Sequence, residues 1–161
     1  MKIGLISDSH DNVGAVARAV ATFKAEDVEA VIHAGDFASA LVLSTLTRLE
    51  IPFYGVYGNS DIGGFGEFRD NPSFTITDGP RRFELGGRKF TVIHDIKKID
   101  LIAEKVEFQT DILIHGHTHR PDSEIRDDIL CVNPGDSCGI LSKGTVAILD
   151  ADDMSVVFYN V

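Results

Sequence analysis

The feature that most constrains this chain is its first apolar run, which ends abruptly in an acid and an imidazole. Residues 2–7 are mainly apolar, and Asp8-Ser9-His10 follow directly. A short apolar run closed by polar residues indicates a buried strand that reaches the edge of a sheet. Because residues i and i+2 of an extended chain point the same way, we expect Asp8 and His10 to reach one point. A two-residue pattern is common by chance, so the pair gains weight only through repetition.

Four later apolar runs end in the same kind of chemistry. In α/β sheets, binding sites lie outside the carboxyl ends of the strands, so the side chains that follow these runs are expected to converge on one edge. The runs and the side chains that follow them are 31–35 with Asp36, 54–58 with Asn59, 91–93 with His94, and 112–115 with His117 and His119.

These seven side chains form a nitrogen and oxygen donor set without a thiolate. Such a set suits Mn, Fe, Zn, Ni or Mg, and it disfavours Cu(I) and iron–sulfur clusters. Seven donors are too many for one tetrahedral ion, whereas two ions that share one carboxylate would use them all. Asp36, on a tight Gly35-Asp36 turn, is the predicted shared ligand. Two divalent ions, Asp8, Asp36 and one hydroxide would leave a net positive charge, which attracts phosphate.

The order of the other patterns predicts two stacked sheets with helices outside, in one domain over residues 1–161. Strand, helix, strand, helix, strand over residues 2–58 implies parallel pairing with right-handed crossovers. The first helix is expected to begin after Asp11 or Asn12, and the second at Ser39. A long loop is predicted at 60–72 and a third amphipathic helix at 99–108. Strands are predicted at 29–36, 52–58, 73–77, 82–85, 88–94, 111–115, 123–126, 129–132, 145–149 and 155–159.

Charge and cysteine content limit the partners of this chain. The net charge of −10 argues against a broad nucleic-acid or anionic-membrane surface. No apolar run approaches the length of a membrane span, so no membrane partner is expected. Cys131 and Cys138 lack metal or redox spacing, which predicts reduced thiols in a cytoplasmic protein. The oligomeric state stays open, a homo-oligomer included.

Five ordered motifs resemble those of the calcineurin-like metallophosphoesterases, and most of all the small single-domain prokaryotic phosphodiesterase branch. The resemblance implies a four-layer α/β/β/α sandwich, an α/β fold with two mixed β-sheets flanked by helices. It also implies one metal on Asp8, His10, Asp36 and His119, and a second on Asp36, Asn59, His94 and His117. The motifs are Asp8-x-His10, Gly35-Asp36, Gly58-Asn59-x-Asp61, His94 and Gly116-His117-x-His119, and Asn133-Pro134-Gly135 fits the same branch.

The activity that this resemblance implies is hydrolysis of a small phosphate ester. A dinuclear centre would hold a bridging hydroxide that attacks phosphorus in line. Manganese is the metal expected first, with Ni, Co, Fe, Zn or Mg as alternatives. Asn59 would bind metal and also touch the phosphate as a catalytic residue. A phosphodiesterase is favoured; the alternatives are a phosphomonoesterase and a non-catalytic interaction scaffold like the retromer subunit of the same fold.

Two positions depart from the family pattern. Asp95 stands where a glycine usually follows the histidine that matches His94, and it could tighten the metal, pair with a lysine or crowd the substrate. Ser60 stands where classical phosphatases carry histidine and the small branch often carries cysteine, which leaves the source of the general acid open. His33 and His115 lie inside apolar runs, so we expect them in the core or behind the ligands.

Overall fold

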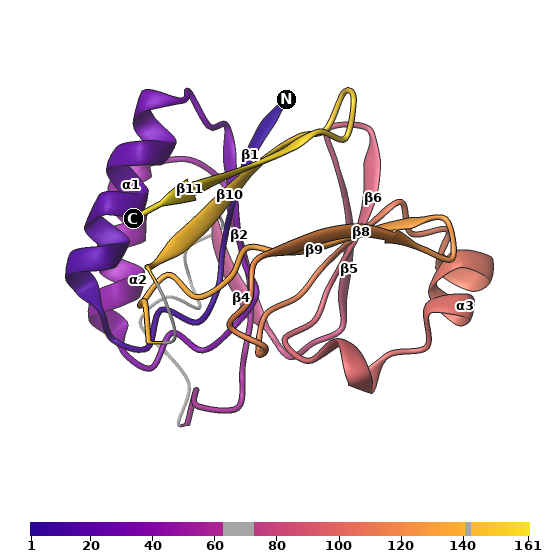
Figure 1. Ribbon diagram of the computed structural model, residues 1–161, viewed down its shortest axis with the longest axis horizontal. Coiled ribbons are helices and arrows are strands. Elements are labelled where there is room, and N and C mark those ends of the chain that lie inside the picture. Colours follow the sequence, from indigo (N-terminus) through magenta and orange to yellow (C-terminus); the bar gives the residue numbers. More distant parts are fainter. Residues whose placement is uncertain (63–72, 141–142) are drawn as a thin grey trace.

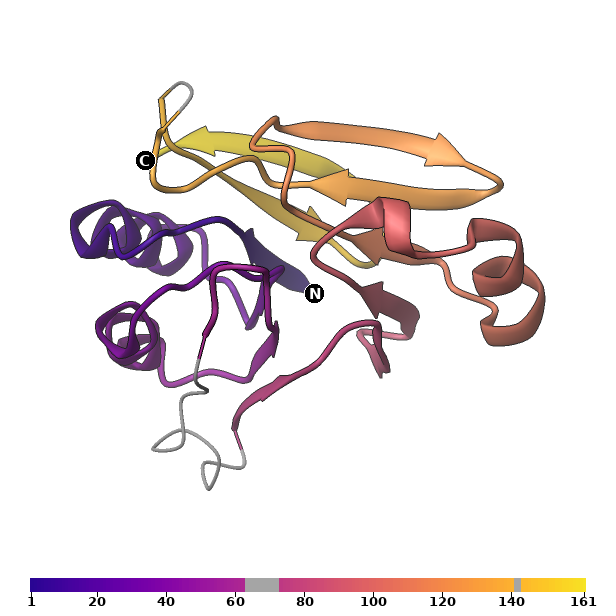
Figure 2. The same ribbon diagram turned by 90° about the horizontal axis from the view of Figure 1, so that it is seen from below.

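Two β-sheets stacked face to face form the centre of the molecule, and helical segments cover the outer faces (Figures 1 and 2). This computed structural model describes residues 1–62, 73–140 and 143–161. The six-stranded sheet has the order β11-β10-β1-β2-β3-β4, and the five-stranded sheet has the order β5-β6-β7-β9-β8. Both sheets mix parallel and antiparallel pairs, as the resemblance implied.

The strands of the first sheet are β1 (Lys2–Ile6), β2 (Ala30–His33), β3 (Phe53–Val56), β4 (Phe74–Thr77), β10 (Thr145–Asp150) and β11 (Val156–Asn160). Those of the second are β5 (Arg81–Leu85), β6 (Arg88–Val92), β7 (Ile112–Ile114), β8 (Asp122–Arg126) and β9 (Ile129–Asn133). The helical segments are α1 (Val13–Ala25), α2 (Ala40–Leu46), η1 (Thr47–Leu49), η3 (Ile96–Lys98), α3 (Leu101–Ala103) and η4 (Glu104–Phe108).

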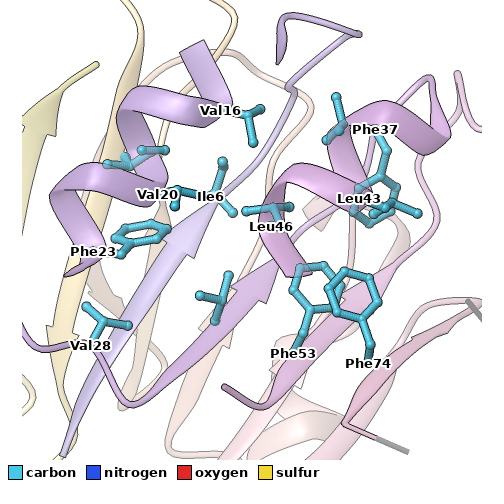
Figure 3. Packing of buried hydrophobic residues seen from close by; sticks show 14 of the residues in the cluster. Ile6, Val16, Val20, Phe23, Val28, Phe37, Leu43, Leu46, Phe53 and Phe74 are labelled. Carbon is cyan, nitrogen blue, oxygen red and sulfur yellow. The ribbon is translucent and has the colours of Figure 1, made fainter. Parts of the chain in front are cut away.

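Strands β1 to β4 pair in parallel, with α1 between β1 and β2 and α2 between β2 and β3, so the expected parallel pairing is confirmed. Asn12 begins α1 by accepting the N–H of Ala15 on its side-chain oxygen at 3.1 Å. The buried face of α1 carries Val16, Val20 and Phe23, which pack on the outer face of the first sheet (Figure 3).

A second apolar layer lies between the two sheets. Leu5 and Ile32 from the first sheet are fully buried against Val92 and Ile114 from the second. Because β1 and β2 are covered on both faces, almost all of their residues are buried, as continuous apolar runs predict. This core fixes the strand ends of one sheet relative to those of the other.

The helix predicted over 99–108 is present over 101–108, but it is shorter and less regular than expected. The segment contains the short helix α3 and the π-helical turn η4. Ile102 and Val106 are 65% and 72% exposed, whereas Glu104 is 1% exposed. Glu104 accepts hydrogen bonds from Arg82, Thr91 and Thr110, so a polar contact decides which face of the segment turns inward.

The predicted long loop at 60–72 lies largely outside the described residues, which resume at Ser73. The helices that the structure describes are all too short or too polar to cross a membrane.

Candidate metal centre

Five loops at strand ends bring the seven predicted side chains together. The loops follow β1, β2 and β3 of the first sheet and β6 and β7 of the second, and each of these strands runs parallel to its neighbour in the set. Parallel strands end at the same edge, so the two stacked sheets present one shared edge. The side chains are Asp8, His10, Asp36, Asn59, His94, His117 and His119.

The local backbone differs from the extended geometry that we expected for Asp8 and His10. Their φ angles are 51° and 37°, in the left-handed region. Asp36, His117 and His119 also have positive φ angles of 61°, 68° and 59°. The side chains therefore converge through tight turns after the strands, and the alternation of an extended chain does not explain their approach.

One group of side chains surrounds Asp8. His119 Nε2 lies 3.5 Å from Asp8 Oδ1, and His10 Nε2 lies 3.9 Å from the same oxygen. His10 Nε2 is also 3.5 Å from Asp36 Oδ2. The rings of His10 and His119 are stacked with their centroids 5.2 Å apart.

A second group surrounds the side-chain oxygen of Asn59. That oxygen lies 3.1 Å from His94 Nε2 and 2.9 Å from His117 Nδ1. His94 Nε2 is also 3.4 Å from Asp36 Oδ2. One oxygen of Asp36 therefore faces both groups, which is the position that a shared ligand requires.

The charges and unpaired atoms of the two groups fit a cation. Asp8 and Asp36 are 0% and 2% exposed. Burial raises the pKa of Asp8 above its ordinary value. Burial alone would also raise the pKa of Asp36, but hydrogen bonds from His94 and from the Ser60 N–H outweigh it and lower that pKa. His10 Nε2 is buried without a hydrogen-bond partner among the described residues. A divalent ion would neutralise these carboxylates and satisfy this nitrogen.

Asp61 holds the loops after β2 and β3 in place. Its Oδ2 accepts the N–H groups of Asp36 at 2.9 Å and of Gly58 at 2.8 Å, and its Oδ1 accepts that of Ala38 at 2.9 Å. Gly58 is required here because an added Cβ would lie 2.1 Å from Asp36 Oδ1. The sequence placed Asp61 in a motif, but its contacts to three backbone N–H groups were not predicted.

Asp136 is a residue of the site that the sequence analysis missed. It is 1% exposed, and its Oδ2 lies 3.0 Å from His119 Nδ1. A carboxylate on the far nitrogen orients a ligand histidine and raises its basicity. Cys138 is close enough to form a compact group with Asp136 and His119. The available signal was the short run Asn133-Pro134-Gly135-Asp136 that follows the buried strand β9.

Asn133 supports the loop that carries the last two histidines. Its Nδ2 donates to the carbonyl oxygen of Gly116 at 3.0 Å and to Thr118 Oγ1 at 2.9 Å. His115 Nδ1 lies 3.3 Å from the same nitrogen. Asn133 is fully buried, so this contact fixes the turn from inside the second sheet.

The remaining singled-out residues lie behind or beside the two groups. His33 is fully buried; its Nε2 lies 2.9 Å from Ser9 Oγ, and burial lowers its pKa well below the ordinary value. His115 is 4% exposed, so both histidines occupy the internal positions expected of them. Asp95 accepts the N–H of Lys97 at 3.1 Å and begins η3, and its Oδ2 lies 4.0 Å from His117 Nε2.

A family model and several curated proteins that resemble this chain all belong to the phosphoesterases. The sequence model of the calcineurin-like phosphoesterase superfamily domain matches residues 1–154. Phosphodiesterase MJ0936 of Methanocaldococcus jannaschii is 35% identical over 160 residues, which cover 94% of each chain. A probable metallophosphoesterase of Methanothermobacter thermautotrophicus is 34% identical over 146 residues, which cover 84% of this chain and 76% of the other.

Solved structures show the same fold. One, described as a novel archaeal phosphodiesterase, aligns over all of both chains with a TM-score of 0.86 and 32% identity. Vps29 of Cryptosporidium parvum aligns over 99% of this chain and 97% of its own with a TM-score of 0.73. At 19% identity, the second likeness concerns the fold alone.

Proposed function

Because this chain belongs to the calcineurin-like phosphoesterase superfamily, a family of metal-dependent phosphoric ester hydrolases, we propose that it is a phosphodiesterase with a dinuclear metal centre. The observation that carries this proposal is the position of Asp36 Oδ2, within 3.5 Å of His10 Nε2 and 3.4 Å of His94 Nε2. The name of the archaeal relative supports a diester substrate.

We assign the metal ligands on this geometry. Asp8, His10, Asp36 and His119 would hold one divalent ion, and Asp36, Asn59, His94 and His117 would hold the other. Manganese is the proposed metal, because a borderline nitrogen and oxygen set accepts it readily, and Ni, Co, Fe, Zn and Mg are the alternatives. The ions, when bound, would supply a water of lowered pKa as the nucleophile and polarise the phosphate.

The chain's own residues would orient the substrate. The side-chain oxygen of Asn59 faces His94 and His117, so its Nδ2 is the atom that can donate to a phosphate oxygen. The side chain of His117 is 44% exposed, which places it where an entering ester meets the centre. Asp136 would hold the proton on His119 Nδ1. His119 Nε2, which faces Asp8, would then stay free of a proton and able to bind a metal ion.

Ser60 favours diesters over alkyl monoesters. It follows Asn59, and its N–H donates to Asp36 Oδ1 at 2.9 Å. A serine hydroxyl is too weak an acid to protonate a departing alkoxide near neutral pH. Aryl leaving groups need less protonation than alkyl ones, so aryl esters, diesters included, suit a site that has serine here.

We propose a cytoplasmic location on the two unpaired cysteines, Cys131 and Cys138.

A second candidate function is a non-catalytic scaffold, which the fold likeness to Vps29 raises. The seven candidate ligand positions all carry residues that can bind metal, and this argues for catalysis. A phosphomonoesterase is the third reading, and Ser60 argues against it.

Turnover of bis-p-nitrophenyl phosphate against p-nitrophenyl phosphate tests these alternatives. Each metal is added separately to stripped protein, and Asp8→Asn serves as the inactive control. We expect metal-dependent turnover that is faster on the diester. A protein that binds metal but hydrolyses neither compound would be a scaffold, and faster turnover of the monoester would identify a phosphomonoesterase.

A further inference from the structure

Two pockets of opposite charge are lined by residues of the same segment, 94–98, which carries the candidate ligand His94. The first, which we call the acidic pocket, has a volume of about 300 Å³ and includes Asn59 and His94 in its wall. Its charged residues are Asp78 and Asp95 against a single cation, Lys98. Because it contains two candidate ligands, this pocket opens directly onto the position of the phosphate.

The second, which we call the cationic pocket, has a volume of about 610 Å³. Its charged residues are Lys97, Arg120 and Arg126 against one acid, Asp122. An excess of positive charge is unexpected in a chain whose net charge is −10, which argues that this pocket is specialised.

The loops that carry candidate ligands form the wall between the pockets. Lys97 follows His94 by three residues, and Arg120 follows His119 directly. The two loops meet where His117 Nε2 lies 4.0 Å from Asp95 Oδ2. The acidic pocket thus contains candidate ligands, and the cationic pocket adjoins the centre through Thr118 and Arg120, the chain neighbours of His119.

Two of the cations are available to a ligand. Arg126 is already held by Glu124 and by Asp122, the latter at 3.9 Å. Lys97 and Arg120 are exposed, and neither has an ion-pair partner among residues 1–62, 73–140 and 143–161. Arginine binds a phosphate dianion through two N–H groups, and lysine adds a compact point charge.

We infer that the cationic pocket binds an additional phosphate group on one ester arm of the substrate, while the acidic pocket takes the uncharged arm. The inference rests on the proposed phosphodiesterase function, because only a phosphodiester carries two ester substituents that can occupy two pockets. Lys97 and Arg120 would attract the terminal phosphate, and Asp78 and Asp95 would repel it from the other pocket. The substrate class is then a nucleotide-like phosphodiester with a terminal phosphate monoester.

The test compares two substrates that release the same leaving group. One is the 5′-p-nitrophenyl ester of thymidine 5′-phosphate with a free 3′-hydroxyl, and the other carries a 3′-phosphate. In the wild type we expect kcat/KM to be about tenfold higher for the phosphorylated compound, a difference of about 1.4 kcal/mol. The gain should appear in KM with kcat unchanged, because this contact is equal in the ground and transition states. Raising the salt concentration should reduce it.

The variant Lys97→Gln/Arg120→Gln should lower this preference to nearly one. The matched control, Lys24→Gln/Arg48→Gln, removes the same net charge from exposed positions outside both pockets and should keep the preference. An equal loss in both double variants, or no preference in the wild type, would overturn the inference. Turnover of bis-p-nitrophenyl phosphate by the wild type is measured in parallel, so that a failure of the proposed function is seen separately.

Discussion

At the scale of single residues, Asp36 is the position on which the candidate centre depends most. One of its oxygens faces His10 and His94, and the other accepts the N–H of Ser60. Asp36→Asn removes the charge that both ions would share, whereas His119→Ala removes a ligand from one ion. We expect Asp36→Asn to lose more activity and more bound metal, as measured by steady-state kinetics and by metal analysis after gel filtration. Two ions retained with near-normal turnover would contradict the bridging role.

The prediction for Ser60 concerns the departure of poor leaving groups. A general acid typically contributes about 10²–10⁴-fold, and serine cannot act as one near neutral pH. We expect the wild type to be much faster on an aryl phosphate diester than on an alkyl phosphate, and Ser60→His to narrow the gap by accelerating the alkyl compound. The measurement is kcat/KM for both compounds in both proteins at saturating Mn²⁺. An equal change on both substrates would show that this position does not protonate the leaving group.

The candidate ligands could be predicted because each one lies within four residues after an apolar run. Their supporting residues could not. Asp136 reaches His119 across a separate loop, and Asp61 acts on backbone N–H groups of two other loops. Such contacts depend on how loops from different strands approach one another, and a single sequence carries no pattern for that distance. The positive φ angles of Asp8 and His10 were missed for the same reason.

At the scale of elements, the segment from α3 to η4 is held by a buried carboxylate. Burial alone would raise the pKa of Glu104, but hydrogen bonds from Arg82, Thr91 and Thr110 outweigh it and lower the pKa below its ordinary value. A lowered folded-state pKa stabilises the protein fully above the unfolded-state pKa, and this contribution is lost as pH falls through the folded-state value.

Glu104→Gln should therefore destabilise the protein by about 2 kcal/mol at pH 7 and by less near pH 3. The measurement is urea unfolding at both pH values, and the exposed Glu107→Gln is the matched control. A penalty that is the same at both pH values would show that the charge of Glu104 is not what holds the segment.

This element also shows where periodicity misleads. Within the predicted amphipathic helix, the apolar side chains of Ile102 and Val106 are exposed. Arg82 on β5 provides the buried partner that turns Glu104 inward, and it lies 22 residues earlier in the sequence. The partner of such a contact cannot be identified from the segment alone.

At the scale of the whole molecule, metal should stabilise as well as activate. The candidate ligands come from both sheets, so bound ions would link them. We expect chelated protein to be inactive and to regain turnover with Mn²⁺, Ni²⁺ or Co²⁺. At a metal concentration of a hundred times Kd the gain is about 2.7 kcal/mol, or roughly 5–10 °C in Tm for a domain of this size. Differential scanning fluorimetry measures the shift, and Asp8→Asn should reduce it. Full activity in a verified metal-free sample would contradict the mechanism.

The elements of the fold could largely be predicted from local patterns, whereas the pairing of distant strands could not. The parallel order of β1 to β4 follows from alternating strands and helices. The stacking of two sheets was expected from the order of the patterns, but the insertion of β10 beside β1 was not predicted. Apolar runs show that strands are buried, but they do not say which neighbour covers them.

The place of β1 between β2 and β10 also determines the order in which the newly synthesised chain can complete the first sheet. Ile3 pairs with Ala30 on one side and with Leu149 on the other. Until the region around Leu149 has been synthesised, one edge of β1 has no partner, and such long-range pairing is slow to form. An open edge of this kind can join other chains. Because the loop of Asp8 and His10 leaves directly from β1, the catalytic geometry would be completed among the last steps of folding.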